Sequence, residues 1–98
     1  EIVGAVIASD RFGNLITNIH ERDIFPQLEK ADELEVTVQI GGRTISGLSD
    51  RYSSVAWGKP LALVGSTGRL EISVNGGSAR NFFGTRPGEE VIVRRSSP

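Results

Sequence analysis

The sequence contains no cysteine and no methionine, and it has only one histidine and one tryptophan. Without cysteine, neither a disulfide framework nor a thiolate metal site can form. A single histidine cannot supply a histidine-rich cluster, so we expect no metal site. No apolar run approaches the roughly 18 residues that a membrane span needs, and no secretory leader is visible. We therefore expect a cytoplasmic protein that makes no membrane contact.

The missing methionine also bears on domain organisation. The chain opens on Glu1, directly inside a strand-like run, whereas a ribosomal product starts with methionine. We expect the 98 residues to be a single domain of a longer protein, with the missing part upstream. A domain of this size has a thin core, so docking onto another surface would stabilise it.

The net charge of −1 conceals a division along the chain. Residues 1–49 carry four basic and eight acidic side chains, whereas residues 50–98 carry seven basic and four acidic ones. This division favours docking or a bound anion over a general nucleic-acid surface.

Short β-branched runs, several with clear alternation, predict strands along most of the chain. Gly41-Gly42 between two such runs predicts a hairpin with a primed two-residue turn. A short helix is expected within residues 22–33. Six or seven strands with at most two short helices predict an all-β fold, a small antiparallel β-barrel or sandwich. The expected strands are Ile2–Ser9, Leu15–His20, 34–40, 43–48, 61–65, 69–75 and Glu90–Arg95.

Two glycine-containing rims are the candidate binding regions, "DRFGN" at residues 10–14 and "STG…NGG" at residues 66–77. Turn glycines let backbone groups approach a flat or anionic molecule closely. The Asn14 amide can donate and accept at once, as an adenine edge requires, and Phe12 and Tyr52 offer aromatic faces. The alternative for Asn14 is a turn residue whose side chain bonds its own backbone.

Several other polar residues have two interpretations. Ser66 can bond a carboxylate or cap a hairpin turn, and Glu71 can face a substrate ammonium or be a solvated surface charge. His20 is interpreted as a surface residue, because no serine or acid motif surrounds it. Trp57 is either a lid on the core or an interface anchor.

Two long segments carry a resemblance to a known family. "DRFGNLITNI", followed some fifty residues later by "GSTGRLEISVNGGSA", resembles the carboxy-terminal domain of the S-adenosyl-L-methionine (SAM) hydroxide adenosyltransferases, relatives of the fluorinase and chlorinase. The resemblance extends over residues 3–93. It implies a β-barrel that follows an α/β domain, in a homotrimer whose SAM site lies between the α/β domain of one subunit and the barrel of its neighbour.

The resemblance also implies a role for each matching residue. Asn14 would read the adenine edge, Phe12 would wall the pocket, and Tyr52 would close over the adenosine. Ser66 would bond the methionine carboxylate, and Glu71 would face the methionine ammonium. Val74 and Gly76 would make backbone contacts to adenine. The reaction would convert SAM and water into adenosine and L-methionine, with SAM as substrate and no cofactor. The groups that orient the water would belong to the other domain, so this chain would hold no catalytic residue and be inactive alone.

The departures from the family pattern concern the reaction. Fluorinase-like members have an arginine where Thr67 stands and a serine where Glu71 stands, so the chain is closer to the hydrolases. Two alternatives stay open, an oligonucleotide-binding barrel and a structural barrel that makes oligomer contacts. The first requires a basic groove, which scattered arginines do not supply, and we expect no nucleic-acid partner.

Overall fold

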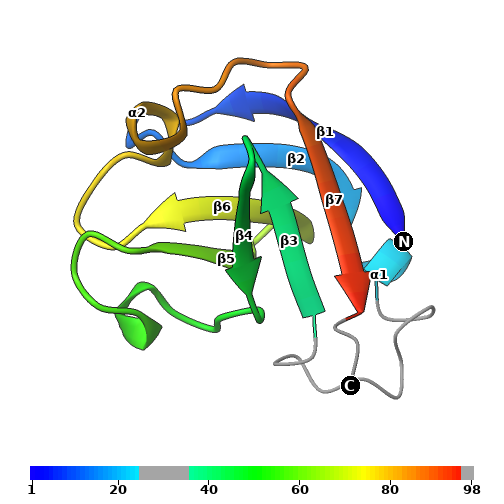
Figure 1. Ribbon diagram of the computed structural model, residues 1–98, viewed down its shortest axis with the longest axis horizontal. Coiled ribbons are helices and arrows are strands. Elements are labelled where there is room, and N and C mark those ends of the chain that lie inside the picture. The colour runs from blue at the N-terminus through cyan, green and yellow to red at the C-terminus, as the bar shows by residue number, and fades with distance from the viewer. Residues whose placement is uncertain (25–35, 96–98) are drawn as a thin grey trace.

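The computed structural model describes residues 1–24 and 36–95 of the 98-residue chain (Figure 1). These residues form seven antiparallel strands, two short helices and one 3₁₀ turn, which confirms the predicted all-β fold. The elements in chain order are β1 (Ile2–Ser9), β2 (Leu15–His20), α1 (Glu21–Ile24), β3 (Val36–Ile40), β4 (Arg43–Ser46), η2 (Tyr52–Ser54), β5 (Pro60–Val64), β6 (Arg69–Val74), α2 (Ala79–Phe83) and β7 (Glu90–Arg95).

The strands follow the order β4-β3-β7-β1-β2-β6-β5 and curl into a nearly closed barrel (Figure 1). The two edges approach each other where the chain leaves β4, because Ser49 pairs in parallel with Leu63 of β5. The Ser49 N–H donates to the carbonyl oxygen of Ala62 at 2.7 Å. This contact satisfies backbone groups that an open sheet edge would leave unpaired.

The β3–β4 hairpin shows how the pattern produces the core. Val36, Val38 and Ile40 alternate with polar residues and point inward, where their exposed fractions are 2% or less. Gly41 and Gly42 both have positive φ, +57° and +76°, as the predicted primed turn requires. Burial of one face fixes the register, since a slip by one residue would turn the apolar side chains to solvent.

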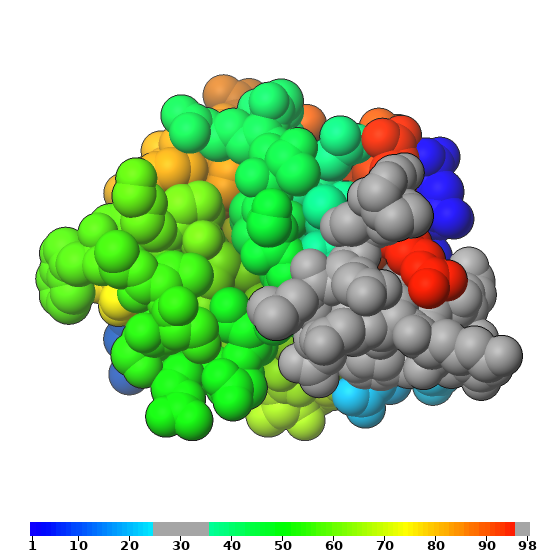
Figure 2. All heavy atoms as spheres, turned by 60° about the horizontal axis from the view of Figure 1, so that its bottom comes forward, coloured from blue at the N-terminus to red at the C-terminus, as the bar shows by residue number. Residues whose placement is uncertain are grey.

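Some other predictions are not confirmed. Residues 34 and 35 of the predicted third strand, and most of the predicted helix at 22–33, lie outside the described residues. Trp57 is 79% exposed, so its interpretation as a lid on the core is wrong. Its segment, between β4 and β5, protrudes at one side of the molecule (Figure 2). Within residues 1–24 and 36–95, no helix combines the length and apolar character that crossing a membrane requires.

Candidate functional site

The loop between β1 and β2, residues 10–14, is organised by one carboxylate. Asp10 Oδ1 accepts the backbone N–H groups of Phe12 at 2.9 Å and Asn14 at 3.0 Å, and its Oδ2 accepts Nδ2 of Asn14 at 2.9 Å. Burial would raise the pKa of Asp10, but these hydrogen bonds outweigh it and hold the pKa below its ordinary value of 3.8. The Asn14 side chain is thus oriented by Asp10 rather than by its own backbone, which was the alternative interpretation.

This loop lies directly against the segment that follows β6. A Cβ atom on Gly13 would overlap the Ser78 side chain, and Gly13 has a φ of +84°, so the position has neither space nor backbone tolerance for another residue. The Gly13 carbonyl oxygen accepts the N–H of Arg80 at 2.9 Å. The first rim and the "NGG" end of the second therefore lie side by side, whereas the "STG" end lies at the other end of β6.

A shallow hollow of about 490 Å³ opens where the loop and the "NGG" segment lie side by side. Asn14 is 8% exposed there, whereas Phe12 and Tyr52 are 67% and 44% exposed. Aromatic faces around one buried amide suit a flat, heteroatom-rich ring. The hollow brings together five of the seven predicted site residues, and its lining consists of Phe12, Asn14, Tyr52, Val74, Gly76 and Gly77.

The other two predicted residues, Ser66 and Glu71, do not line this hollow. Ser66 is exposed in the β5–β6 turn, where the Gly68 N–H donates to the Gly65 carbonyl oxygen at 2.9 Å. No hydrogen bond joins the Ser66 hydroxyl to another described residue, so it does not cap the turn. Glu71 is half-buried beside that turn, since a Cβ on Gly65 would overlap its carboxylate.

Glu71 and Asp10 form a pair of negative charges that the sequence did not reveal. Burial raises the pKa of Glu71 above 4.5, and the charge of Asp10 raises it further. Two carboxylates that repel each other gain free energy when a cation binds between them. Asp10 thus both orients Asn14 and adds negative charge near Glu71. The only sequence signal was its position at the start of the loop, four residues before Asn14.

Trp57 and His20, which lie outside the hollow, contact neighbouring parts of the fold. The Trp57 ring covers Gly76, where a Cβ would overlap it. Hydrogen bonds hold this loop in place, from Gly58 N–H to the Asn75 carbonyl at 2.8 Å and from Asn75 Nδ2 to the Val55 carbonyl at 2.9 Å. His20 Nδ1 accepts the N–H of Arg22 at 3.2 Å, a local turn contact.

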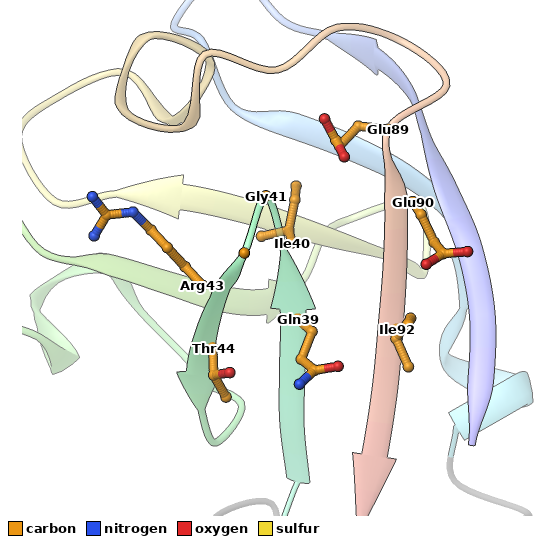
Figure 3. A pocket seen from close by; sticks show the side chains of 9 residues that line it. Gln39, Ile40, Gly41, Arg43, Thr44, Glu89, Glu90 and Ile92 are labelled. Atoms are coloured by element: carbon orange, nitrogen blue, oxygen red, sulfur yellow. The ribbon is translucent and has the colours of Figure 1, made fainter.

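A second hollow, of about 290 Å³, lies at the tip of the β3–β4 hairpin and contains none of the predicted site residues (Figure 3). Glu89 and Glu90 border it, but the Arg43 side chain points away from them (Figure 3). The Arg43 guanidinium instead lies 4.8 Å from the centre of the Phe82 ring. In the described part of the chain, no three histidine or acidic side chains are grouped to hold a metal ion.

Comparison with known proteins adds to this geometry. Residues 4–92 match the model of the SAM hydroxide adenosyltransferase C-terminal domain. The chain is 35% identical over 88 residues to the (R)-S-adenosyl-L-methionine hydrolase of Thermus thermophilus, covering 90% of this chain and 30% of that protein. It superposes on the crystal structure of a conserved protein from Thermotoga maritima with a TM-score of 0.76 and 31% identity, over 94% of this chain and 35% of the other. It also superposes on the crystal structure of a conserved protein from Thermus thermophilus with a TM-score of 0.73 and 33% identity, over 94% of this chain and 34% of the other. The chain thus spans about a third of the length of these relatives.

Proposed function

Because the chain belongs to the family of the SAM hydroxide adenosyltransferase C-terminal domain, we propose that it is the substrate-binding barrel of a SAM hydrolase. The observation that carries the proposal is the hollow in which Phe12, Asn14, Tyr52, Val74 and Gly76 meet. The enzyme would convert SAM and water into adenosine and L-methionine. The similarity to a protein named as a SAM hydrolase supports this reaction.

The hollow would take the adenosine end of SAM. The Asn14 amide has one N–H engaged with Asp10, which leaves its second N–H and its carbonyl oxygen for the adenine edge. Phe12 and Tyr52 would stack on the flat base, and the exposure of their rings supports that role. The segment from Val74 to Gly76 would offer backbone groups, for which the absence of a side chain at Gly76 leaves room.

The methionine end would extend toward the β5–β6 turn. There the half-buried Glu71 carboxylate, close to the charge of Asp10, would hold the ammonium group. The exposed hydroxyl of Ser66 would donate to the methionine carboxylate. Contacts at both ends would fix the C5′ carbon between them, which reduces the entropy lost on reaching the transition state.

The chemical step would use groups from outside this chain. A water-derived oxygen would bond to C5′ while the C5′–S bond breaks, its electron pair would stay on the methionine sulfur, and the proton of the water would pass to a base. We infer that the base and the water-orienting groups lie in an upstream α/β domain, and that the site is completed by a neighbouring subunit of a homotrimer. The barrel would then bind and orient SAM without catalysing its hydrolysis.

Kinetics of the full-length enzyme test the proposal. Adenosine release from SAM, followed by chromatography, should show kcat/KM at least about tenfold lower in Asn14→Ala and in Ser66→Ala, because the first loses its hydrogen bonds to the adenine edge and the second loses one to the methionine carboxylate. Asn81→Ala and Ser46→Ala are matched controls, since both residues are exposed and lie outside the hollow. Unchanged kinetics in the Asn14 and Ser66 variants would refute the assigned contacts.

The same experiment separates the alternatives. If SAM affinity survives removal of Asn14, Ser66 and Glu71 together, the barrel serves oligomer contacts instead. If no adenosine forms but an oligonucleotide binds with strong salt dependence, the chain is a nucleic-acid-binding barrel.

A further inference from the structure

The pairing of β2 with β6 is interrupted next to Glu71. Ile16 lies opposite Glu71, and the next paired residue along β2 is His20, opposite Arg69. Three residues of β2, 17–19, therefore stand against a single residue of β6. A bulge of this kind bends its strand and disrupts the hydrogen-bond ladder, and bulges often lie next to functional sites, where they aim a side chain.

The Thr17 hydroxyl holds the two strands together at this bulge. It donates to the Leu70 carbonyl oxygen at 2.7 Å and accepts the Ile19 N–H at 3.2 Å. One side-chain oxygen thus links a backbone N–H of β2 to a backbone carbonyl of β6. Thr17 and Leu70 are 0% exposed and Ile19 is 2% exposed, so water cannot replace the hydroxyl as their partner. Backbone groups buried this deeply cost free energy when they are left unpaired.

The strand pattern shows that this hydroxyl is unusual. Residues 15, 17 and 19 of β2 are all buried, and the two that flank Thr17 are the apolar Leu15 and Ile19. A hydroxyl in such a place costs free energy unless it is hydrogen-bonded, whereas a valine of nearly the same shape would fill the space without that cost. Packing alone therefore does not account for a threonine here, and the bulge does.

The bulge is also held on the side of β1. The Asn18 Oδ1 accepts the N–H of Ala5 at 2.9 Å. A Cβ on Gly4 would overlap both Asn18 and Ile19, so the strands approach closely at this point. Side chains at two successive positions thus fix where along β2 the bulge lies.

The position of the bulge links it to the two ends of the proposed SAM site. Asn14 directly precedes β2, and Ile16, two residues later, lies opposite Glu71. Thr17 then fastens β2 to Leu70, the residue next to Glu71 in β6. The register of these strands decides where the Glu71 carboxylate lies relative to Asn14, because a slip of one residue would turn side chains to the other face.

We propose that Thr17 is a positioning residue of the site, whose hydroxyl holds β2 and β6 in the register that sets Glu71 beside the loop of Asn14. This role rests on the proposed function, since it assigns Thr17 to the binding of the methionine ammonium. Thr17 would act through Glu71 and would not touch SAM, because its side chain is fully buried.

Thr17→Val and Thr17→Ser in the full-length enzyme test this role. Thr17→Val keeps the shape and removes the hydroxyl, so kcat/KM for SAM should fall about tenfold, as when one hydrogen bond to a charged group is lost. Thr17→Ser keeps the hydroxyl and should recover most of that loss. The inhibition constant of adenosine, which has no methionine end, should change by less than about twofold in both variants.

A double-mutant cycle separates positioning from a general loss of stability. In the Glu71→Gln background, Thr17→Val should lower kcat/KM by less than about twofold, because the residue through which it acts has already lost its charge. Val38→Ala is the control, since it opens the core at a fully buried residue of β3, a strand that pairs with neither β2 nor β6. It should lower the Tm, as Thr17→Val does, and leave kcat/KM unchanged.

A second variant covers the case in which Thr17→Val does not fold. Asn18→Ala changes an exposed residue and loosens the same bulge from the side of β1. It should lower kcat/KM when Glu71 is present and leave it unchanged in the Glu71→Gln background.

The results separate an error about Thr17 from an error about the proposed function. If Asn14→Ala and Ser66→Ala lower kcat/KM but neither bulge variant does, the proposed function stands and the positioning role is wrong. The role is also overturned if Thr17→Val costs as much with Gln as with Glu at position 71, or if Val38→Ala lowers kcat/KM equally. Unchanged kinetics in the Asn14, Ser66 and Thr17 variants alike would refute both.

Discussion

Gly13→Ala should destabilise the barrel, because two separate costs meet at this residue. Its φ of +84° lies in the left-handed region, which costs an alanine ~1–2 kcal/mol. The new Cβ would also overlap the Ser78 side chain, and overpacking of this kind costs typically ~1–3 kcal/mol. We expect a loss of about 2–5 kcal/mol in the free energy of unfolding.

A double-mutant cycle separates the two costs. Ser78→Gly alone should cost only a few tenths of a kcal/mol, although the Ser78 Oγ accepts the Asn81 N–H at the start of α2 at 3.2 Å. In the double variant the overlap with the side chain disappears, and the nearest remaining atom would be the Ser78 Cα at 3.1 Å. The coupling between the two changes should therefore be about 1–3 kcal/mol in the direction of rescue.

Urea denaturation of the 98-residue chain and its variants measures these values. Gly42→Ala is the control for backbone cost alone, because Gly42 has a φ of +76° and no atom within 4 Å of a new Cβ. It should lose only ~1–2 kcal/mol. If the free-energy changes of Gly13→Ala and Ser78→Gly simply add in the double variant, the loop at residues 10–14 does not contact Ser78.

Three further predictions concern the charged end of the site and its rim. Glu71→Gln should stabilise the chain at pH 7, because a carboxyl whose pKa is raised in the folded state is penalised when ionised. The free energies of unfolding of the two proteins, measured against pH, should converge as the pH falls through that raised pKa toward 4.5. A difference that does not change with pH would contradict this. Asp10→Asn should lower the Glu71 pKa only part of the way toward 4.5, since burial is the larger cause of its shift. A carbon-detected NMR titration of Glu71 measures this pKa. A full return to 4.5 would show that Asp10, and not burial, is the larger cause. Trp57→Ala should raise KM for SAM in the full-length enzyme by loosening Gly76, and Trp57→Phe should restore most of it; equal loss in both variants would indicate a direct role for the indole.

Local patterns predicted much of the fold. Alternation in β3 and paired glycines at 41 and 42 act over neighbouring residues, and the structure contains the expected hairpin. The "FGN" and "VNGG" segments were expected to serve one site, and Asn14 and Gly76 do line one hollow. For the hairpin the determining physics, turn conformation and burial of one strand face, lies within a few residues of sequence, whereas the shared site of Asn14 and Gly76 was implied by the family resemblance.

Features that depend on contacts between distant segments escaped prediction. Trp57 was interpreted as either a lid on the core or an interface anchor, and the lid is wrong because hydrogen bonds between its loop and Asn75 leave the ring on the outside. Glu71 occupies a polar position of its strand, a pattern typical of a solvated charge. Its pKa is raised by burial and further by Asp10, which the pairing of β2 with β6 brings near it.

The position of Asp10 connects the two ends of the site. Its carboxylate fixes Asn14 through two hydrogen bonds, one to the backbone and one to the side chain. Burial raises the pKa of Glu71 and the same charge raises it further, which makes the carboxylate pair costly to ionise. A ligand that placed a flat base against Asn14 and a cation beside Glu71 would relieve that cost while using an amide that is already oriented. Proteins often store unfavourable electrostatics of this kind where a ligand is meant to remove it. In the proposed function, one loop and one strand of the described residues would thus supply both the amide that orients a base and the charge that attracts a cation.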